Sequence, residues 1–252
     1  MIAALLNGVA IDPERQAIHL DDRGMLYGDG VFETMLAQHG NVRFVDDHFQ
    51  RLQDSCKRLN ISIPDIAVLH IDLQQLTRPH PDAVVKLIVT RGRGSRGYRP
   101  SKGEATRIWQ VFASPTSSSS GIALRWCTTR LARNEQFAGM KHLNKLEQVM
   151  AQSEWYDSHI AEGLMLDTEG ELVCGTMSNI FMVIDDALIT PDLRFCGVQG
   201  IMRKNVLRIA SELNIAVEMR SVRPEELLGA SEVFVTNAVR GIQPVQEILP
   251  SH

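Results

Sequence analysis

The chain has 252 residues, of which 44% are hydrophobic and 22% charged, and its formal net charge is -4. Such a composition is ordinary for a globular protein, and the slight negative charge produces no field that attracts nucleic acid or an anionic membrane. No apolar run approaches the roughly 18–20 residues of a membrane span, and the N-terminus lacks the basic start of a signal peptide. The four cysteines, Cys56, Cys127, Cys174 and Cys196, show neither CxxC pairing nor metal-ligand spacing. We therefore expect a reduced, cytoplasmic protein without a bound metal.

The first part of the chain is predicted to combine short strands with one helix. Strands are expected at 2–6, 31–38 and 84–90, where apolar residues gather in short runs. The helix is expected to begin near Asp46 and Asp47, which are good capping residues. It carries Phe49, Leu52, Cys56 and Leu59 at helical spacing.

A serine-rich stretch at 114–121 is predicted to be a linker between a small N-terminal α/β domain, 1–113, and a C-terminal domain, 122–252. Beyond it we expect a helix over about 142–158, a second over 201–214, and a short one led by Pro224. Strands are expected at 163–167, 171–174, 180–184, 216–221 and 232–236. The order of elements indicates an α+β fold in two parts with mixed sheets, not a regular βαβ alternation.

Lys141 stands in an apolar setting, within the sequence AGMKHLNKLE at 138–147. Beside Met140 and Leu143 its ammonium would be partly desolvated, which favours loss of the proton. A free amine is the nucleophile that Schiff-base chemistry requires. By itself this indicates little, because most lysines are solvated surface residues.

Three segments have the residues to bind an anion. A glycine turn at 197–200 leads into the helix expected at 201, where unpaired N–H groups suit a phosphate. Arg51 follows His48 by one helical turn, and its guanidinium can fork onto phosphate. An apolar strand ends in small polar residues at 235–238. Each has an ordinary alternative, as a tight turn or an exposed side chain. Together with the lysine they predict a phosphorylated aldehyde cofactor in a cleft between the two domains.

Six short motifs follow one another along the chain: DRG at 22–24, YGDGVFE at 27–33, HxxRL at 48–52, KxxN at 141–144, SNIF at 178–181 and GIxR at 200–203. In this order they resemble the fold-type IV pyridoxal-phosphate enzymes, the aminotransferase class IV family, over about residues 2–247. That family includes branched-chain and D-amino-acid aminotransferases and aminodeoxychorismate lyases. The segments TRGRGSRGY at 90–98 and KHLNKLEQ at 141–148 look most like the lyases. The resemblance implies a small N-terminal α/β domain and a larger C-terminal domain with a β-barrel-like mixed sheet.

The resemblance also implies the cofactor, pyridoxal 5'-phosphate, and the residues that hold it. Lys141 is expected to form the Schiff base. The phosphate is expected to be bound by Arg51, by the backbone N–H groups of Ile201 and Met202, and by Asn237 and Ala238.

For the substrate, the resemblance points to a glycine-rich loop. Arg91, Arg96 and Tyr98 are expected to bind the two carboxylates of the substrate, although a mobile basic loop without this role is an alternative for each of them. Tyr27 and Phe32 are candidates for the walls of the same pocket, with a place in the core as their alternative.

Cys174 departs from the family pattern. Five positions before the asparagine of the SNIF motif the family has a glutamate that pairs with the pyridine nitrogen, and here Cys174 takes that position. Glu171 is offset by three residues, which on a strand points to the opposite face. A carboxylate keeps the ring nitrogen protonated, whereas a thiol does so poorly unless it is ionised. Carbanion stabilisation should therefore weaken, and we expect a lyase to tolerate this better than a transaminase.

These expectations lead to a preferred function and two alternatives. The preferred function is a lyase that converts 4-amino-4-deoxychorismate to 4-aminobenzoate and pyruvate in folate synthesis, with Lys141 as the general base. The runner-up is a D-amino-acid or branched-chain aminotransferase, and the third possibility is a catalytically silent binding protein. We expect a small-molecule substrate, a homodimer, and no nucleic-acid or membrane partner.

Overall fold

The chain divides into two compact units. The computed structural model describes residues 1–14, 18–100, 103–115 and 121–251. The N-terminal unit comprises Met1–Thr116 together with Lys141–Asn144, and the C-terminal unit comprises Ser117–Met140 and Lys145–His252. The change of unit after Thr116 lies inside the predicted linker, although residues 116–120 fall outside the described part. The sequence had placed Lys141 in the C-terminal domain. In the structure Lys141–Asn144 groups with the N-terminal unit.

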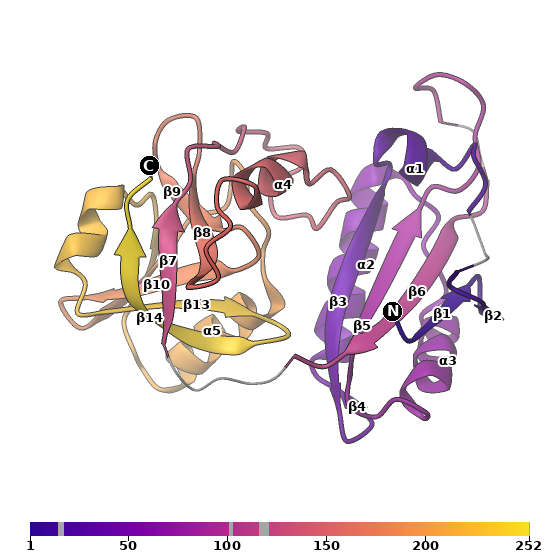
Figure 1. Ribbon diagram of the computed structural model, residues 1–252, viewed down its shortest axis with the longest axis horizontal. Helices are drawn as coiled ribbons and strands as arrows, with labels where there is room; N and C mark the ends of the chain where they lie inside the picture. Colours follow the sequence, from indigo (N-terminus) through magenta and orange to yellow (C-terminus); the bar gives the residue numbers. More distant parts are fainter. Residues whose placement is uncertain (15–17, 101–102, 116–120, 252) are drawn as a thin grey trace. The chain divides into compact units, whose positions relative to one another are not determined.

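The N-terminal unit is an antiparallel sheet of six strands in the order β2-β1-β6-β5-β3-β4, with helices α2 and α3 on one face (Figure 1). Its elements are β1 (Ala3–Leu6), β2 (Val9–Ile11), α1 (Arg23–Tyr27), β3 (Gly30–Gln38), β4 (Asn41–Val42), α2 (Val45–Leu59), α3 (Ile66–Thr77), β5 (Ala83–Thr90) and β6 (Thr106–Ala113). The predicted strands at 2–6, 31–38 and 84–90 and the helix near 46 are therefore confirmed.

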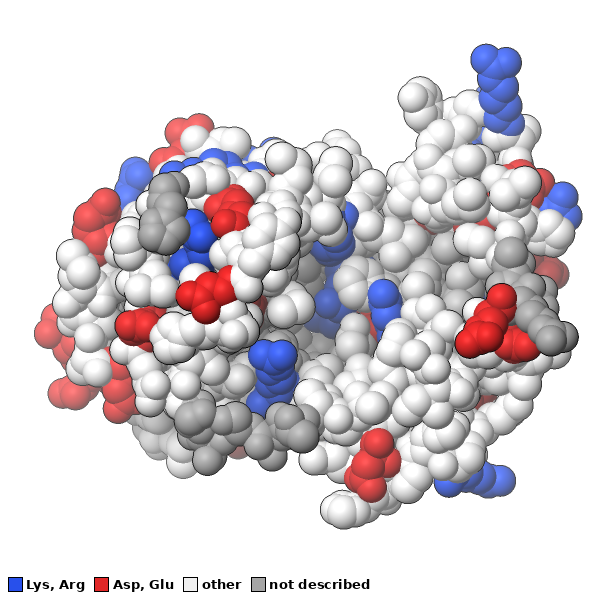
Figure 2. Space-filling model, in the orientation of Figure 1, with Lys and Arg blue, Asp and Glu red and all other residues white. Residues whose placement is uncertain are grey.

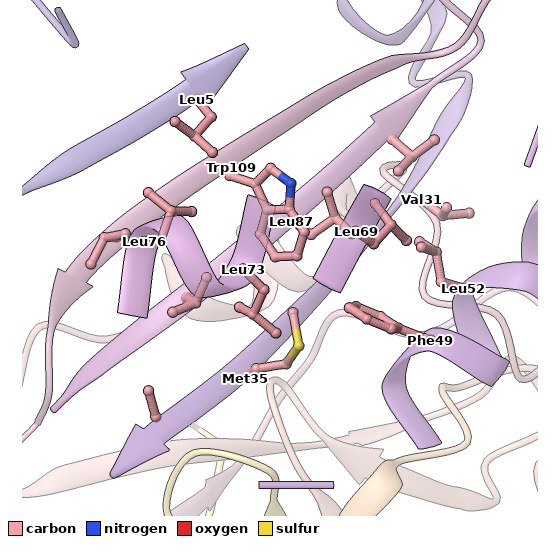
Figure 3. Close-up of a cluster of buried hydrophobic side chains, with 14 of the residues drawn as sticks. Leu5, Val31, Met35, Phe49, Leu52, Leu69, Leu73, Leu76, Leu87 and Trp109 are labelled. Atoms are coloured by element: carbon pink, nitrogen blue, oxygen red, sulfur yellow. The ribbon is translucent and has the colours of Figure 1, made fainter. Parts of the chain in front are cut away.

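Alternation along β3, β5 and β6 gives this sheet two different faces. The odd-numbered residues of the three strands point towards the helices, as Met35, Leu87 and Trp109 do, and pack against Phe49 and Leu69 (Figure 3). Side chains on a strand alternate between faces, so the even-numbered residues lie on the opposite face. Those residues are mostly half-buried, which leaves this second face as the one on which a ligand can be recognised.

The C-terminal unit is built on one mixed sheet of eight strands in the order β12-β11-β10-β13-β14-β7-β8-β9. Three neighbouring pairs are parallel, β11 with β12, β14 with β7, and β7 with β8, and the others are antiparallel. The sheet curls so that β9 also approaches β10, which confirms the expected barrel-like form. Its elements are β7 (Ile122–Trp126), α4 (Leu146–Gln152), β8 (Ile160–Leu166), β9 (Leu172–Gly175), β10 (Asn179–Ile184), β11 (Ala187–Pro191), α5 (Ile201–Glu212), β12 (Val217–Arg220), the 3₁₀-helix η1 (Pro224–Gly229), β13 (Glu232–Asn237) and β14 (Gly241–Leu249).

The helix expected over about 142–158 is shorter than predicted. Helix α4 spans only Leu146–Gln152, because the backbone before it is already bonded to β3. No helix in the described part of the chain is long and apolar enough to cross a membrane. On the face shown in Figure 2, acidic and basic side chains are interspersed over the C-terminal unit.

Candidate functional site

The segment that carries Lys141 runs along the start of β3. The N–H of Phe32 donates to the carbonyl oxygen of Lys141 at 2.9 Å, and the N–H of Leu143 donates to that of Gly30 at 2.9 Å. The Asn144 amide donates to the carbonyl of Gly28 at 3.1 Å. Gly28 has a φ of +64°, and a Cβ there would lie 2.6 Å from Asn144 Oδ1. A glycine at 28 therefore leaves room for Asn144, and the bonds of this segment to Gly28, Gly30 and Phe32 fix the backbone of Lys141.

An aromatic ring lies next to the Lys141 amine. Lys141 Nζ lies 4.2 Å from the centroid of the Phe32 ring. An ammonium within about 6 Å of a ring face is attracted to its quadrupole, and the ring displaces water from one side of the amine. The sequence attributed the apolar setting to Met140 and Leu143, and the structure adds the ring of Phe32, which had been a candidate for the pocket wall.

Arg51 is held by a buried carboxylate. Its Nε donates to Glu33 Oε1 at 2.8 Å and one Nη donates to Glu33 Oε2 at 2.6 Å. His48 Nδ1 lies 2.6 Å from the same Oε2, and Glu33 is only 1% exposed. Burial alone would raise the pKa of Glu33, but Arg51 and His48 outweigh it and hold that pKa at about 2. The two carboxylate oxygens of Glu33 thereby orient the guanidinium of Arg51. The family resemblance predicts that this guanidinium binds the cofactor phosphate.

Arg91 is held by several partners within the N-terminal unit. Its Nε and Nη2 donate to the two oxygens of Asp29 at 2.7 and 3.0 Å, and its nitrogens also donate to the carbonyls of Asn60 and Leu59, each at 2.7 Å. An arginine has five N–H donors, and four are used in these bonds. That Arg91 also binds a substrate carboxylate stays a prediction. Its partners lie 31 to 62 residues away in sequence, so no local sequence pattern could indicate them.

Tyr27 and Tyr98 contact each other in the structure. Their rings form an edge contact with centroids 5.5 Å apart, and the Tyr27 hydroxyl accepts from the N–H of Gly97 at 3.2 Å. Arg23 secures the same loop by donating to the carbonyls of Gly97 and Tyr98. Arg96 is exposed, and no side chain in the described part of the chain forms an ion pair with it. Of the two arginines predicted for the substrate, Arg96 is the one whose guanidinium remains accessible.

In the C-terminal unit, α5 starts without a side-chain cap. Gly200 is its N-cap residue, and among the described residues this helix start has no side-chain cap hydrogen bond. Asn179 Nδ2 donates to the carbonyl of Val198 at 2.9 Å, which ties the preceding turn to β10. A Cβ on Gly200 would lie 2.0 Å from Asn179 Oδ1, so only glycine fits here. Uncapped N–H groups and the positive end of the helix dipole form a site for an anion, at the predicted residues Ile201 and Met202.

A buried hydroxyl supports the same conclusion. Thr236 lies on β13 directly opposite Asn179, is 1% exposed, and its Oγ1 has no hydrogen-bond partner in the described part of the chain. A buried polar atom without a partner is costly, and an anion oxygen would satisfy it. Asn237, which the sequence had favoured, uses its Oδ1 to accept from the N–H groups of Val239 and Arg240. The residues at this strand end thus fit a phosphate, with Thr236 as the better-placed side chain.

We expect Gly200→Ala to weaken the binding of pyridoxal 5'-phosphate by about 10- to 100-fold, the scale of one or two lost charge-assisted hydrogen bonds. The added methyl would push Asn179 away and displace the start of α5. Fluorescence titration of the apoprotein measures the dissociation constant. Gly229→Ala is the matched control, because a Cβ there meets nothing within 4 Å. Equal affinities for the two variants would contradict this placement.

Cys174 is a buried, neutral thiol. It is 6% exposed and packs in an apolar cluster with Met165 and Leu131. Burial raises its pKa, and the neighbouring Cys196 and Glu162 raise it further. An un-ionised thiol carries no charge, so it does not supply what the family's glutamate gives to the pyridine nitrogen.

Glu162 on β8 is a buried carboxylate that the sequence analysis missed. It is 2% exposed, and its Oε1 accepts from the N–H of Met177 and from Ser178 Oγ at 2.9 Å. Burial raises its pKa, and those two donors oppose the rise. Since Leu164 pairs with Gly175 on these strands, Glu162 lies on the face opposite Cys174 and does not replace the missing glutamate. Instead it fastens the 176–178 turn that leads into Asn179. A lone acidic residue within the apolar sequence IAEGLML was the available signal.

Comparisons with known proteins place this geometry in context. The family model for amino-transferase class IV matches residues 30–248. The chain is 32% identical to an aminodeoxychorismate lyase of Vibrio harveyi over 236 residues, covering 92% of this chain and 87% of the relative. It is 34% identical to a putative branched-chain-amino-acid aminotransferase of Methanocaldococcus jannaschii, covering 96% and 86%. The crystal structure of 4-amino-4-deoxychorismate lyase from Pseudomonas aeruginosa superposes with a TM-score of 0.92 at 40% identity, covering 99% of this chain and 94% of that one.

The match spans both units and includes the lysine segment, the glycine turn before α5 and the end of β13. It confirms the predicted fold type and, at the level of the family, the predicted cofactor. The chain belongs to the class IV amino-transferase family of pyridoxal-phosphate enzymes.

Proposed function

We propose that the protein is an aminodeoxychorismate lyase, which converts 4-amino-4-deoxychorismate to 4-aminobenzoate and pyruvate. The relatives with this name match nearly the whole chain, but aminotransferases match it over a similar length. The choice between them is carried by the neutral thiol of Cys174. A transaminase depends on a protonated ring nitrogen to hold negative charge until a proton is delivered, whereas the lyase expels its leaving group as the charge develops.

Different residues of the chain are proposed to bind different parts of the cofactor. Lys141 is proposed to hold the cofactor covalently, and Arg51, oriented by Glu33, to bind its phosphate. In the C-terminal unit, the start of α5 and the Thr236 hydroxyl are proposed to bind phosphate. When bound, pyridoxal phosphate withdraws electrons from the carbon that carries the substrate amine.

Lys141 is also proposed to move the proton. Once the substrate amine has displaced it, the Lys141 amine removes the proton from C4 of the substrate, the C3–O bond breaks, and the ring becomes aromatic. The protonated Lys141 then returns a proton to the departing enolpyruvyl group, which leaves as pyruvate. The Phe32 ring keeps water from one side of the amine and stabilises its protonated form by cation–π attraction.

The direct test is incubation of the holoenzyme with 4-amino-4-deoxychorismate while the fluorescence of 4-aminobenzoate is followed, with pyruvate measured in parallel. We expect both products in equal amounts. Amino-group exchange between amino acids and 2-oxoglutarate or pyruvate, without 4-aminobenzoate, would instead establish the aminotransferase alternative. Homodimer formation and a cytoplasmic location stay predictions, which size-exclusion chromatography and cell fractionation can test.

We expect Cys174→Glu to raise any transaminase side activity more than it raises lyase turnover. A carboxylate at this position would supply the ring nitrogen with the partner that the thiol lacks. Both activities are measured on the same preparation, and the ratio of the two is compared with wild type. Cys174→Gln, similar in size but uncharged, controls for the disturbance of the apolar cluster. A larger gain in lyase than in transaminase activity would remove the argument from Cys174.

A further inference from the structure

Helix α5 carries a buried arginine in its first turn. Arg203 is the third residue of the helix and is 8% exposed. One Nη donates to the carbonyl oxygen of Pro191 at 3.0 Å, whereas the buried Nε has no hydrogen-bond partner in the described part of the chain. Buried N–H groups are nearly always bonded in native proteins, so this unused donor calls for an explanation.

The charge of Arg203 also lacks a carboxylate partner. Within the described residues no acidic side chain forms an ion pair with it. Asp192 acts on it electrostatically, but the Asp192 carboxylate is already paired with Arg194 at 3.2 Å. The first turn of a helix carries the positive end of its dipole, which opposes a cation at this position. Burial lowers the pKa of Arg203, as is typical of a cation that the protein alone does not compensate.

The guanidinium is bound at the end of the sheet where the proposed phosphate site of the C-terminal unit lies. Its acceptor, Pro191, is the last residue of β11, which runs antiparallel to β10, and β10 begins at Asn179. Asn179 pairs with Thr236, whose buried hydroxyl likewise has no partner in the described part of the chain. A Cβ on Gly200 would lie 3.6 Å from Arg203 Cβ, so the arginine stem stands beside the uncapped helix start. Two unsatisfied buried side chains and a helix N-terminus therefore lie at one end of this sheet.

We propose that Arg203 is a further residue of the phosphate site, where its buried charge stabilises the phosphate of pyridoxal 5'-phosphate at the start of α5. The inference rests on the proposed placement of that phosphate, and it applies equally to a lyase and to an aminotransferase. The backbone N–H groups and the Thr236 hydroxyl are neutral donors, whereas Arg203 adds a full positive charge. Because that charge is buried, salt screens it little. The phosphate in turn compensates a cation that is unfavourable in the apoprotein.

The test compares the affinity of the apoprotein for pyridoxal 5'-phosphate with its affinity for pyridoxal, which has the same ring and aldehyde but no phosphate. Fluorescence titration measures both dissociation constants, and the ratio of the two affinities isolates the contribution of the phosphate. Arg203→Met should lower this ratio by about 10- to 100-fold, the scale of one unit charge acting on an anion through the protein interior. Arg203→Lys keeps the charge and should retain most of the ratio.

The matched control is Arg208→Met, because Arg208 is an exposed arginine of the same helix and pairs with Glu212 at the surface. This variant should leave the ratio within about twofold of wild type. A general disturbance of α5 by the loss of an arginine would lower the ratio in both Met variants and would overturn the inference.

Thermal unfolding of the apoprotein, with and without inorganic phosphate, distinguishes this role from a purely structural one. Phosphate should raise the Tm of wild type and should raise that of Arg203→Met less, because the variant binds the ion more weakly. If Arg203 only fastened α5 to β11, the variant would lose the same stability with and without phosphate and would keep the wild-type affinity ratio. That result would overturn the inference.

Failure of the inference can be told apart from failure of the proposals on which it rests. An unchanged affinity ratio in Arg203→Met would overturn the role of Arg203 and leave the phosphate placement intact. Equal affinity of wild type for pyridoxal and for pyridoxal 5'-phosphate would overturn the phosphate placement, and the inference with it. The release of 4-aminobenzoate by the holoenzyme tests the reaction separately, since neither affinity depends on it.

Discussion

Replacing Lys141 with alanine is expected to abolish covalent attachment of pyridoxal phosphate and to lower turnover by about 10³-fold or more, since nucleophile and general base are lost together. The fold should persist, because the segment is held to β3 by its backbone and by Asn144, not by the lysine side chain. Borohydride reduction followed by peptide mass spectrometry should locate the cofactor on Lys141 in wild type and nowhere in the variant.

The control for this experiment is Lys57→Ala, which removes an exposed lysine of α2. It should keep the visible colour and full turnover. Turnover by Lys141→Ala close to the wild-type rate would end the assignment of Lys141, and with it the proposed reaction.

The second large effect is expected from Arg51→Met. This change leaves the buried Glu33 carboxylate with His48 alone, and removing one partner of a buried ion pair costs about 3–5 kcal/mol of stability. It should also weaken the binding of pyridoxal phosphate, because the guanidinium proposed to bind the phosphate is gone. Urea unfolding of the apoprotein measures the first effect, and fluorescence titration measures the second.

The pH dependence of the stability loss identifies its cause. In wild type the pKa of Glu33 is lowered from its ordinary 4.5 to about 2, so the stability from this carboxylate is present above pH 4.5 and is lost as the pH falls towards 2. In Arg51→Met the pKa of Glu33 rises, and its charge is relieved by protonation at a higher pH. The difference between the two proteins should therefore be largest above pH 4.5 and shrink below it. A difference that does not change with pH would assign the loss to packing instead.

The limits of the sequence analysis are clear in the first sheet. Strand β5 was predicted because its run of apolar residues can be recognised in the sequence without knowledge of any distant partner. Strand β6 was missed because Arg107 occupies one of its helix-facing positions. An arginine is tolerated there because Asp72 of α3, 35 residues away, accepts a hydrogen bond from Arg107 Nε at 2.7 Å. Asp72 also accepts one from the Trp109 indole at 3.0 Å. A strand whose inward charge is neutralised by a distant residue has no period-2 apolar signal.

The candidate site residues show the same difference between local sequence signals and distant contacts. Lys141, the helix start at Ile201 and the anomaly at Cys174 could be read from motifs, since each depends on residues close in sequence. The hydrogen bonds of Arg91 and the buried position of Glu162 could not be read in this way. Their contacts are with residues distant in sequence, such as Asp29 for Arg91 and Ser178 for Glu162. A single charged residue inside an apolar strand indicates a burial problem, and the sequence alone does not say what solves it.

The attachment of Lys141–Asn144 to β3 has a consequence for biosynthesis. While the ribosome is still making the chain between β6 and Lys141, residues 30–32 of β3 have backbone groups on their outer edge that await this segment. Unpaired strand edges invite pairing with other chains, so the nascent N-terminal unit is at its most aggregation-prone in this interval. Emergence of Lys141 from the ribosome closes that edge, so the same four residues that carry the proposed cofactor-binding amine also end the exposure of the sheet.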